Sequence, residues 1–311
     1  MKLNRTILFL LLAAAICSVA CDSVEDKKGR FLLKGNAKME ENDYKGARDF
    51  YNEALQLDQE FSEAYYNRGI TYLLMADYGP AIQDFSKAIS LKNEYADAYY
   101  QRGLAYLDFG EYYKSLSDAN ELIKLENEQS SRAWFLQGLG NEALKNYEEA
   151  LISFSKAINL DGKNADLFVN RATMYFYLKD VDKALKDLDT AEELNPNEPN
   201  LFNLRSMIAF EKEAYQEAYD WVQKAIAINS SHPYFYNNRG LYQLYLGKLE
   251  EGLEDINLSL KQDSGNLYGL RNKGIYYFMA GNKELAVKYL QEVYDKDPEI
   301  PLTAEYLNQV N

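Results

Sequence analysis

The sequence is short of the residues from which metal centres and many active sites are built. Its 311 residues include one histidine and two cysteines. The histidine, His232, lies in a polar link typical of a helix cap or surface turn, and no second histidine can complete a zinc site. No Cys/His or Ser/His/Asp set and no glycine-rich phosphate loop stands out. We therefore expect no metal, no cofactor and no enzymatic activity.

Positive charge is also scarce. Lysine and arginine total 34 against 48 acidic residues, which gives a formal net charge of −14. A strongly acidic chain repels the phosphates of nucleic acid and the head groups of anionic lipids. We expect no nucleic-acid partner and no adhesion to a membrane by charge.

Long apolar runs are absent except near the start. Lys2 and Arg5 precede an apolar run over residues 7–17, which is followed by small residues and Cys21. A basic start, a short apolar run and small residues are typical of a secretory signal, and the run is too short to span a bilayer. The end of this segment, from Ser18 to Cys21, resembles a bacterial lipobox, with Ser18 where that family usually has leucine. The resemblance implies cleavage before Cys21 and acylation of its sulfur.

The alternative is a plain secretory signal with an incidental cysteine. Cys17 is a poor acylation site because the bulky Ile16 would lie at the cut. We expect an exported protein anchored by lipid to the cell envelope, with the outer membrane of a diderm bacterium preferred. Asp22 has different meanings for sorting in different bacterial groups, so the inner membrane and either face stay open.

A repeat of 34 residues fills the rest of the chain. Counting eight positions to each of six regularly spaced glycines places repeat starts at 28, 62, 96, 131, 165, 199, 233 and 267. One interval is 35, and the extra residue within 126–130 predicts a local bend. A fixed period of this length indicates a solenoid with no internal domain boundary.

Each repeat divides into two helical stretches with a fixed pattern of large and small residues. Position 4 is always large and apolar, while positions 8 and 20 are small. Position 24 is bulky in every repeat except the third, where it is Ala119. This register resembles the tetratricopeptide repeat (TPR) family. The resemblance implies an all-α, right-handed superhelical solenoid of about eight helix pairs.

The predicted organisation has four parts. Residues 1–20 form the signal, 21–27 a short tether, 28–300 the eight repeats and 301–311 a capping helix. An extended tether reaches only about 25 Å, so the solenoid is expected close to its membrane.

Position 7 is basic in every repeat except the fourth. Four of its arginines have an aspartate sixteen residues later, as in Arg68 with Asp84. In the fourth repeat the two positions are Gln137 and Ser153. The matched change favours a salt bridge between the helices of one repeat. An anion-binding stripe is the alternative.

In the TPR family the first helices line a concave surface through positions 2, 5, 9, 12 and 13. Here these positions are mainly apolar and aromatic, which suits an amphipathic helix or an extended peptide. The alternative is that these residues pack neighbouring first helices together. The candidate groove residues are Tyr66, Ile70, Leu73, Tyr100, Leu104, Leu107, Phe135, Leu139, Phe176, Tyr177, Asn237 and Arg271.

Chaperone-binding TPR proteins clamp a terminal carboxylate with two asparagines and three cationic residues. Asn36 and Asn67 match the asparagines, but Leu32, Asp97 and Gln101 replace the cations. Asp97 would repel a carboxylate, so we reject this clamp.

Three function classes follow. The first is a lipid-anchored scaffold that binds protein or peptide partners for envelope assembly, secretion or wall remodelling. The second is an outer-membrane lipoprotein that binds glycans or small ligands, although such TPR proteins carry long inserted loops that are missing here. The third and least favoured is an enzyme. The sequence names neither the partner nor the oligomeric state.

Overall fold

The computed structural model describes residues 23–310, which form an all-α repeat array as predicted. Seventeen helices and no strand occur over this range. Contacts divide the chain into two compact units, one ending at Leu160 and the other beginning at Asp161. The sequence predicts no such boundary and places a bend at 126–130 instead, so the division is a feature that the repeat count does not reveal.

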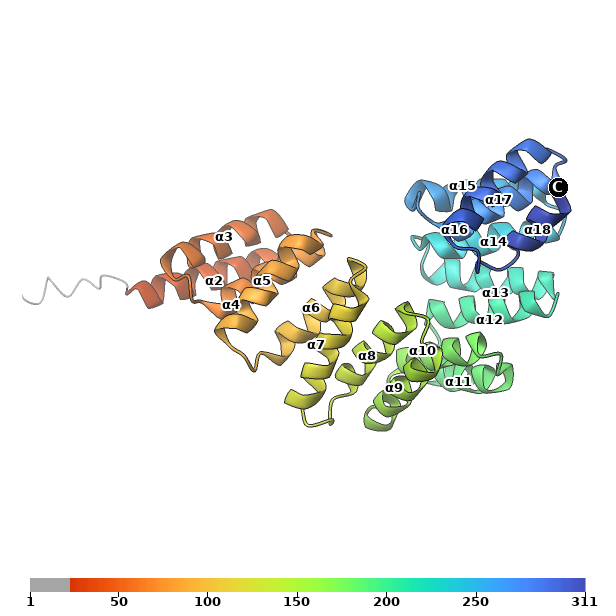
Figure 1. The fold of residues 1–311 in the computed structure, drawn as a ribbon. Helices are drawn as coiled ribbons and strands as arrows, with labels where there is room; N and C mark the ends of the chain where they lie inside the picture. Colours follow the sequence, from red (N-terminus) through yellow and green to blue (C-terminus); the bar gives the residue numbers. More distant parts are fainter. Residues whose placement is uncertain (1–22, 311) are drawn as a thin grey trace, which may run out of the picture. The chain divides into compact units, whose positions relative to one another are not determined.

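The first unit contains four antiparallel helix pairs (Figure 1). Each first helix packs on its own second helix, and each second helix packs on the first helix of the next pair. The pairs are α2 (Val24–Glu40) with α3 (Tyr44–Leu57), α4 (Ser62–Leu74) with α5 (Tyr78–Leu91), α6 (Ala96–Asp108) with α7 (Tyr112–Leu125), and α8 (Ser131–Ala143) with α9 (Tyr147–Leu160).

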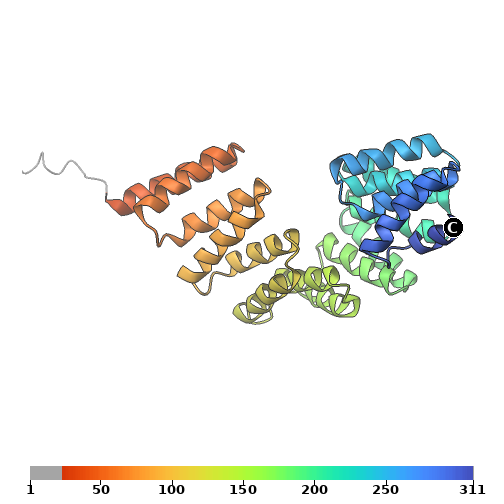
Figure 2. The same cartoon turned by 45° about the horizontal axis from the view of Figure 1, so that its top comes forward.

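The second unit repeats this arrangement and adds a short last helix, α18 (Thr303–Val310), which packs on α17 and α16 (Figure 2). Its pairs are α10 (Ala165–Tyr177) with α11 (Val181–Leu194), α12 (Pro199–Glu211) with α13 (Tyr215–Ile228), α14 (Pro233–Tyr245) with α15 (Leu249–Gln262), and α16 (Leu267–Met279) with α17 (Lys283–Lys296).

Small residues at position 8 let the two helices of a pair approach closely. A Cβ atom added to Gly138 would lie 2.4 Å from the ring of Phe154 at position 24, which is impossible without movement. In the third repeat a different side chain packs against the glycine at position 8. There position 24 is Ala119, and the side chain next to Gly103 is that of Leu136 from the following repeat. Leu136 is fully buried, so it takes the place of the missing large residue.

The first helix starts earlier than the predicted tether allows. Ser23 caps α2, and its hydroxyl accepts a hydrogen bond from the backbone N–H of Asp26 while the Asp26 carboxylate accepts from the backbone of Ser23. This reciprocal capping box fixes the first turn. Residues 24–27, which the prediction places in the tether, are therefore part of the first helix.

Candidate functional site

The predicted pairing between positions 7 and 23 is confirmed. In each of four repeats the arginine donates two hydrogen bonds to both oxygens of the aspartate, over 2.6–2.8 Å. In the fourth repeat the Ser153 hydroxyl donates to Gln137 Oε1 over 3.0 Å. These arginines are engaged inside the repeat, so they do not form an open anion-binding stripe. The four pairs are Arg68–Asp84, Arg102–Asp118, Arg171–Asp187 and Arg239–Asp255.

The other three basic residues at position 7 face an aromatic ring, a contact that was not predicted from the sequence. Each cation lies over the ring at position 23, 5.2–5.7 Å from its centroid. A cation over the face of an aromatic ring is attracted by the ring quadrupole. Arg205 also pairs with the carboxylates of Asp189 and Glu192, each over 2.8 Å. The signal was present at the same sixteen-residue offset. The pairs are Lys34–Phe50, Arg205–Trp221 and Lys273–Tyr289.

The candidate groove residues of the first unit are neither fully buried nor fully exposed. The Tyr66 ring packs at a tilt against that of Tyr95, with centroids 5.0 Å apart, and its centroid lies 5.8 Å from that of Phe85. Phe135 lies 5.9 Å from Phe154. These side chains thus pack within and between repeats while part of their surface stays open. The same half-buried state holds for Tyr66, Ile70, Leu73, Tyr100, Leu104, Leu107, Phe135 and Leu139.

In the second unit, three of the four candidate groove residues are buried and do not offer an open surface. Their exposed fractions are 5% for Phe176, 1% for Asn237 and 5% for Arg271, whereas Tyr177 is 38% exposed. Asn237 is buried because its backbone and side-chain oxygens both accept hydrogen bonds from Asn272 of the next first helix. Packing between neighbouring first helices therefore accounts for the burial of Asn237. Arg271 instead contacts the Pro301 carbonyl, just before the last helix.

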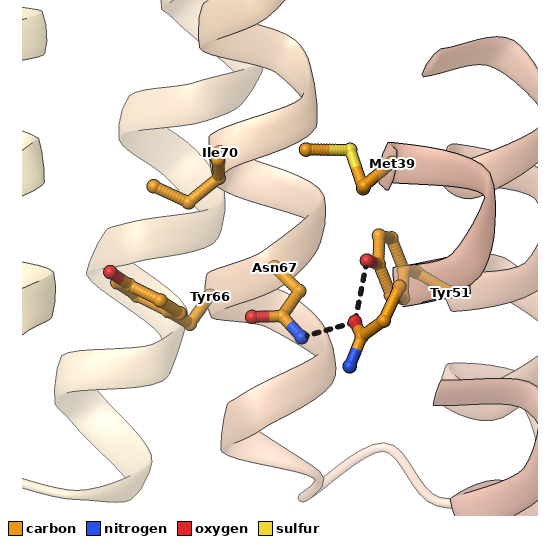
Figure 3. A pocket seen from close by; sticks show the side chains of 6 residues that line it. Met39, Tyr51, Tyr66, Asn67 and Ile70 are labelled. Carbon is orange, nitrogen blue, oxygen red and sulfur yellow. Dashed lines mark hydrogen bonds between the residues drawn. The ribbon is translucent and has the colours of Figure 1, made fainter. Parts of the chain in front are cut away.

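A pocket lies between the first and second repeats, on the side of the first helices (Figure 3). Its volume is about 380 Å³, and all of its lining residues belong to the first unit. Helix α2 supplies two of them, α3 one and α4 three. The lining combines apolar and amide side chains and contains no charged residue. It consists of Asn36, Met39, Tyr51, Tyr66, Asn67 and Ile70.

Two asparagines from neighbouring repeats meet in this pocket. Asn67 Nδ2 donates to Asn36 Oδ1 over 2.9 Å, and the Tyr51 hydroxyl donates to the same oxygen over 2.8 Å. These bonds leave Asn36 Nδ2 as a donor and Asn67 Oδ1 as an acceptor without a partner among residues 23–310. A donor beside an acceptor matches the N–H and C=O groups of a peptide backbone.

Tyr51 fixes the orientation of the Asn36 amide through its hydrogen bond to Asn36 Oδ1. Its exposed fraction is 1%, and burial raises the pKa of its hydroxyl to about 12. The hydroxyl therefore stays protonated at neutral pH and keeps donating to Asn36. Asn36 and Asn67 were singled out in the sequence only as remnants of a carboxylate clamp. The structure shows that they retain hydrogen-bonding capacity in a neutral pocket, which suits an uncharged backbone segment better than a terminal carboxylate.

The described part of the chain contains little that favours a reaction. Burial raises the pKa of the Glu142 carboxyl to about 7, a value suited to general acid–base work. Its carboxyl, however, makes no hydrogen bond within residues 23–310. Over the same range no group of His, Cys, Asp or Glu side chains could hold a metal ion. A membrane-spanning helix is also missing from this range.

Comparison with protein families gives matches along most of the chain. A profile described as "Tetratricopeptide repeat" matches residues 100–165, 169–233 and 237–300, and a second of the same description matches 62–95. A "TPR repeat" profile matches residues 35–75. No enzyme family is among these matches. No curated protein matches the sequence.

Solved structures share the fold at low sequence identity. One chain of the APC/C hetero-tetramer Cut9-Hcn1 aligns with a TM-score of 0.66 and 15% identity, over 86% of this chain and 52% of that one. This chain thus spans about half the length of that relative. MamA (residues 41 to the end) from Desulfovibrio magneticus RS-1 aligns with a TM-score of 0.52 and 20% identity, over 57% of this chain and 99% of that one. The pilF protein of Pseudomonas aeruginosa aligns with a TM-score of 0.52 and 17% identity, over 70% of this chain and 98% of that one.

Proposed function

Because the chain belongs to the tetratricopeptide repeat family, whose members bind proteins and peptides, we propose that it is a non-enzymatic scaffold that binds an extended peptide segment of a partner protein. The observation that carries this proposal is the pocket in the first unit. Its unpaired Asn36 donor and Asn67 acceptor lie beside the apolar side chains of Met39 and Ile70. Backbone hydrogen bonds would supply affinity, and the apolar walls would select the ligand's side chains.

The neutrality of the pocket decides which part of a partner would bind. With no cation in its lining, the pocket gives a terminal carboxylate nothing to offset its loss of hydration. An internal segment carries only neutral backbone groups and needs no such compensation. The partner would therefore thread an internal stretch of chain across the first helices of repeats one and two.

This binding can be tested in the producing cells. A photo-crosslinking phenylalanine analogue at Tyr66 is expected to capture a partner, because Tyr66 lines the pocket. The same analogue at Ile152, which is 58% exposed on the second helix α9, is the control. Asn36→Ala combined with Asn67→Ala should weaken partner binding about thirtyfold and reduce capture accordingly, since two neutral hydrogen bonds of roughly 1 kcal/mol each would be lost.

Asn170→Ala is the matched control, because Asn170 holds the same repeat position as Asn67 but lies in the second unit. It should leave capture unchanged. Equal capture from Tyr66 and Ile152, or full capture by a folded double-alanine variant, would overturn the pocket as the binding site.

We further propose that the scaffold is held at the bacterial cell envelope by acyl chains on Cys21. The support is the sequence before it, since Cys21 lies outside the described residues. One acyl chain binds a bilayer only marginally, so stable anchoring requires more than one. The helical start at Val24 shortens the predicted tether and would keep the first repeat near the membrane.

Metabolic labelling with a palmitate analogue tests this anchor. Cys21→Ser is expected to abolish labelling and to release the protein from the membrane fraction, whereas Cys17→Ser should change neither. Undiminished labelling of the Cys21→Ser variant would refute the anchor while leaving the peptide-binding proposal intact.

A further inference from the structure

Helix α18 covers part of the first-helix surface of the second unit. The Tyr306 hydroxyl donates to the Tyr245 hydroxyl of α14 over 2.8 Å, and the Tyr306 ring meets Phe278 of α16 edge-on at 5.2 Å. Arg271 Nη1 donates over 3.1 Å to the carbonyl of Pro301, just before α18 begins. Tyr245, Arg271 and Phe278, here called the Arg271 surface, occupy positions that line the groove in this repeat family.

Arg271 differs from the other arginines at the helix interfaces. It is 5% exposed, yet no carboxylate lies within ion-pair distance among residues 23–310. Its Nε and Nη2 donate instead to the neutral Asn272 Oδ1 over 2.9 and 2.7 Å. Burial lowers the pKa of Arg271 to about 10, so the guanidinium remains charged at neutral pH. A buried cation without an anion is costly, and an incoming carboxylate would relieve that cost.

The junction between α17 and α18 shows two further local defects. Leu302 has a φ of 66°, in the left-handed region that is unfavourable for a residue with a branched side chain. The Thr303 hydroxyl is buried and makes no hydrogen bond. The other non-glycine residues with positive φ among residues 23–310 belong to the turn that recurs inside each repeat or to the link before repeat four, which holds Asn127 and Glu128. Leu302 belongs to neither group.

Helix α18 is also too short to be stable without its contacts. It has eight residues, and isolated helices of this length do not persist in water. Its attachment depends on the buried side chains of Tyr306, Leu307 and Val310 and on the contacts with the Arg271 surface. A competing helix that offered the same apolar contacts together with an anion would have an advantage over α18.

We propose that α18 is a displaceable internal ligand of the Arg271 surface, and that the external ligand which replaces it is a helical peptide with a carboxylate side chain that pairs with Arg271. This surface lies in the second unit and does not use the Asn36–Asn67 pocket. The two binding proposals can therefore fail separately.

The test uses the full chain and a labelled synthetic peptide with the sequence of residues 299–311, followed by fluorescence anisotropy. Tyr306→Ala in the chain removes both the Tyr245 hydrogen bond and the Phe278 contact. The variant is expected to bind the peptide at least tenfold more tightly than the unaltered chain does. Tyr306→Phe, which removes only the hydrogen bond, should give a smaller increase in the same direction.

Carboxylate selection is tested with peptides that carry Pro301→Asp or Pro301→Asn, because Pro301 is the residue of this segment that Arg271 contacts. The aspartate peptide should bind the Tyr306→Ala chain at least fivefold more tightly than the asparagine peptide. Arg271→Gln in the same chain should abolish this preference, and Arg271→Lys should retain it. Circular dichroism confirms that each variant is folded.

Two results would overturn the proposal. The first is equal peptide binding, or none, by the unaltered and Tyr306→Ala chains. The second is an aspartate preference that persists in a folded Arg271→Gln chain. Crosslinking from Tyr66 should be unaffected by Tyr306→Ala, which separates this surface from the pocket of the first unit.

Discussion

Replacing Arg102 with methionine is expected to lower the free energy of unfolding of the first unit by about 3–4 kcal/mol. Arg102 donates two hydrogen bonds to Asp118, whose side chain is only 4% exposed. Its Nη1 also donates to Ser86 of the preceding repeat over 2.9 Å. Methionine fills much of the volume but leaves a buried carboxylate unpaired. Removing one member of a buried ion pair costs far more than the intact pair contributes.

Urea unfolding followed by Trp134 fluorescence measures this effect, in a Trp221→Phe background that leaves one tryptophan in the chain. Arg132→Met is the matched control. Arg132 also pairs with carboxylates, those of Asp97 and Glu126, but its side chain is 37% exposed. Its loss should cost under about 1 kcal/mol, as expected for a surface ion pair. Similar losses for both variants would contradict the structural role of the Arg102–Asp118 pair.

The cost should depend on pH in a defined direction. Burial raises the pKa of Asp118, and Arg102 opposes that rise. Without Arg102 the pKa rises further, so Asp118 prefers its protonated form in the folded state. A raised folded-state pKa contributes stability at low pH that is lost as pH increases. The deficit of Arg102→Met should therefore be largest at neutral pH and shrink toward pH 4. Adding Asp118→Leu should remove most of the deficit at neutral pH.

Truncating Leu136 to alanine is expected to lower the free energy of unfolding of the same unit by about 3 kcal/mol. Leu136 is fully buried and fills the space beside Gly103 that position 24 fills in other repeats. The truncation leaves a cavity between repeats three and four. Leu74→Ala is the control, because Leu74 is 53% exposed and should cost under about 1 kcal/mol.

A second substitution tests whether Leu136 occupies the space that the large residue at position 24 fills in other repeats, rather than only adding buried apolar area. Ala119→Phe restores the usual large residue at position 24, but alone it should destabilise the unit by about 1–3 kcal/mol through overpacking against Leu136. Combined with Leu136→Ala it should recover at least half of the stability that the single truncation loses. A double variant no more stable than Leu136→Ala would show that the two side chains do not share one space.

Regular features of the repeat could be predicted from the sequence because each recurs in register. The Arg68–Asp84 spacing returns in three other repeats, so chance coincidence is a poor explanation and direct contact is the simplest physical one. The Gln137–Ser153 exchange was predictable for the same reason. The aromatic residues Phe50, Trp221 and Tyr289 lie at the same offset from a basic residue, but the prediction considered only polar partners at that position.

Features that break the register could not be predicted. The groove pattern predicts the same exposure for Tyr66 and Asn237. In the structure Tyr66 is half-buried, whereas Asn237 is 1% exposed. A stripe on a helix shows which residues share a face, but it does not show how closely the next helix packs on that face. The asparagines of the pocket were compared with a clamp that binds charge, and their use in a neutral pocket depends on the position of Tyr51.

The sequence by itself determined the all-α repeat, the position of each helix pair and the ion pairs inside the repeats, because these depend on short-range spacing along helices. Only the tertiary structure decided where the chain divides into two units, how Leu136 replaces the side chain missing at Ala119, and which groove residues stay open. It also placed Arg271 beneath the last helix with no carboxylate of residues 23–310 within ion-pair distance. These outcomes depend on how side chains from different repeats share space, and no single period in the sequence encodes that sharing.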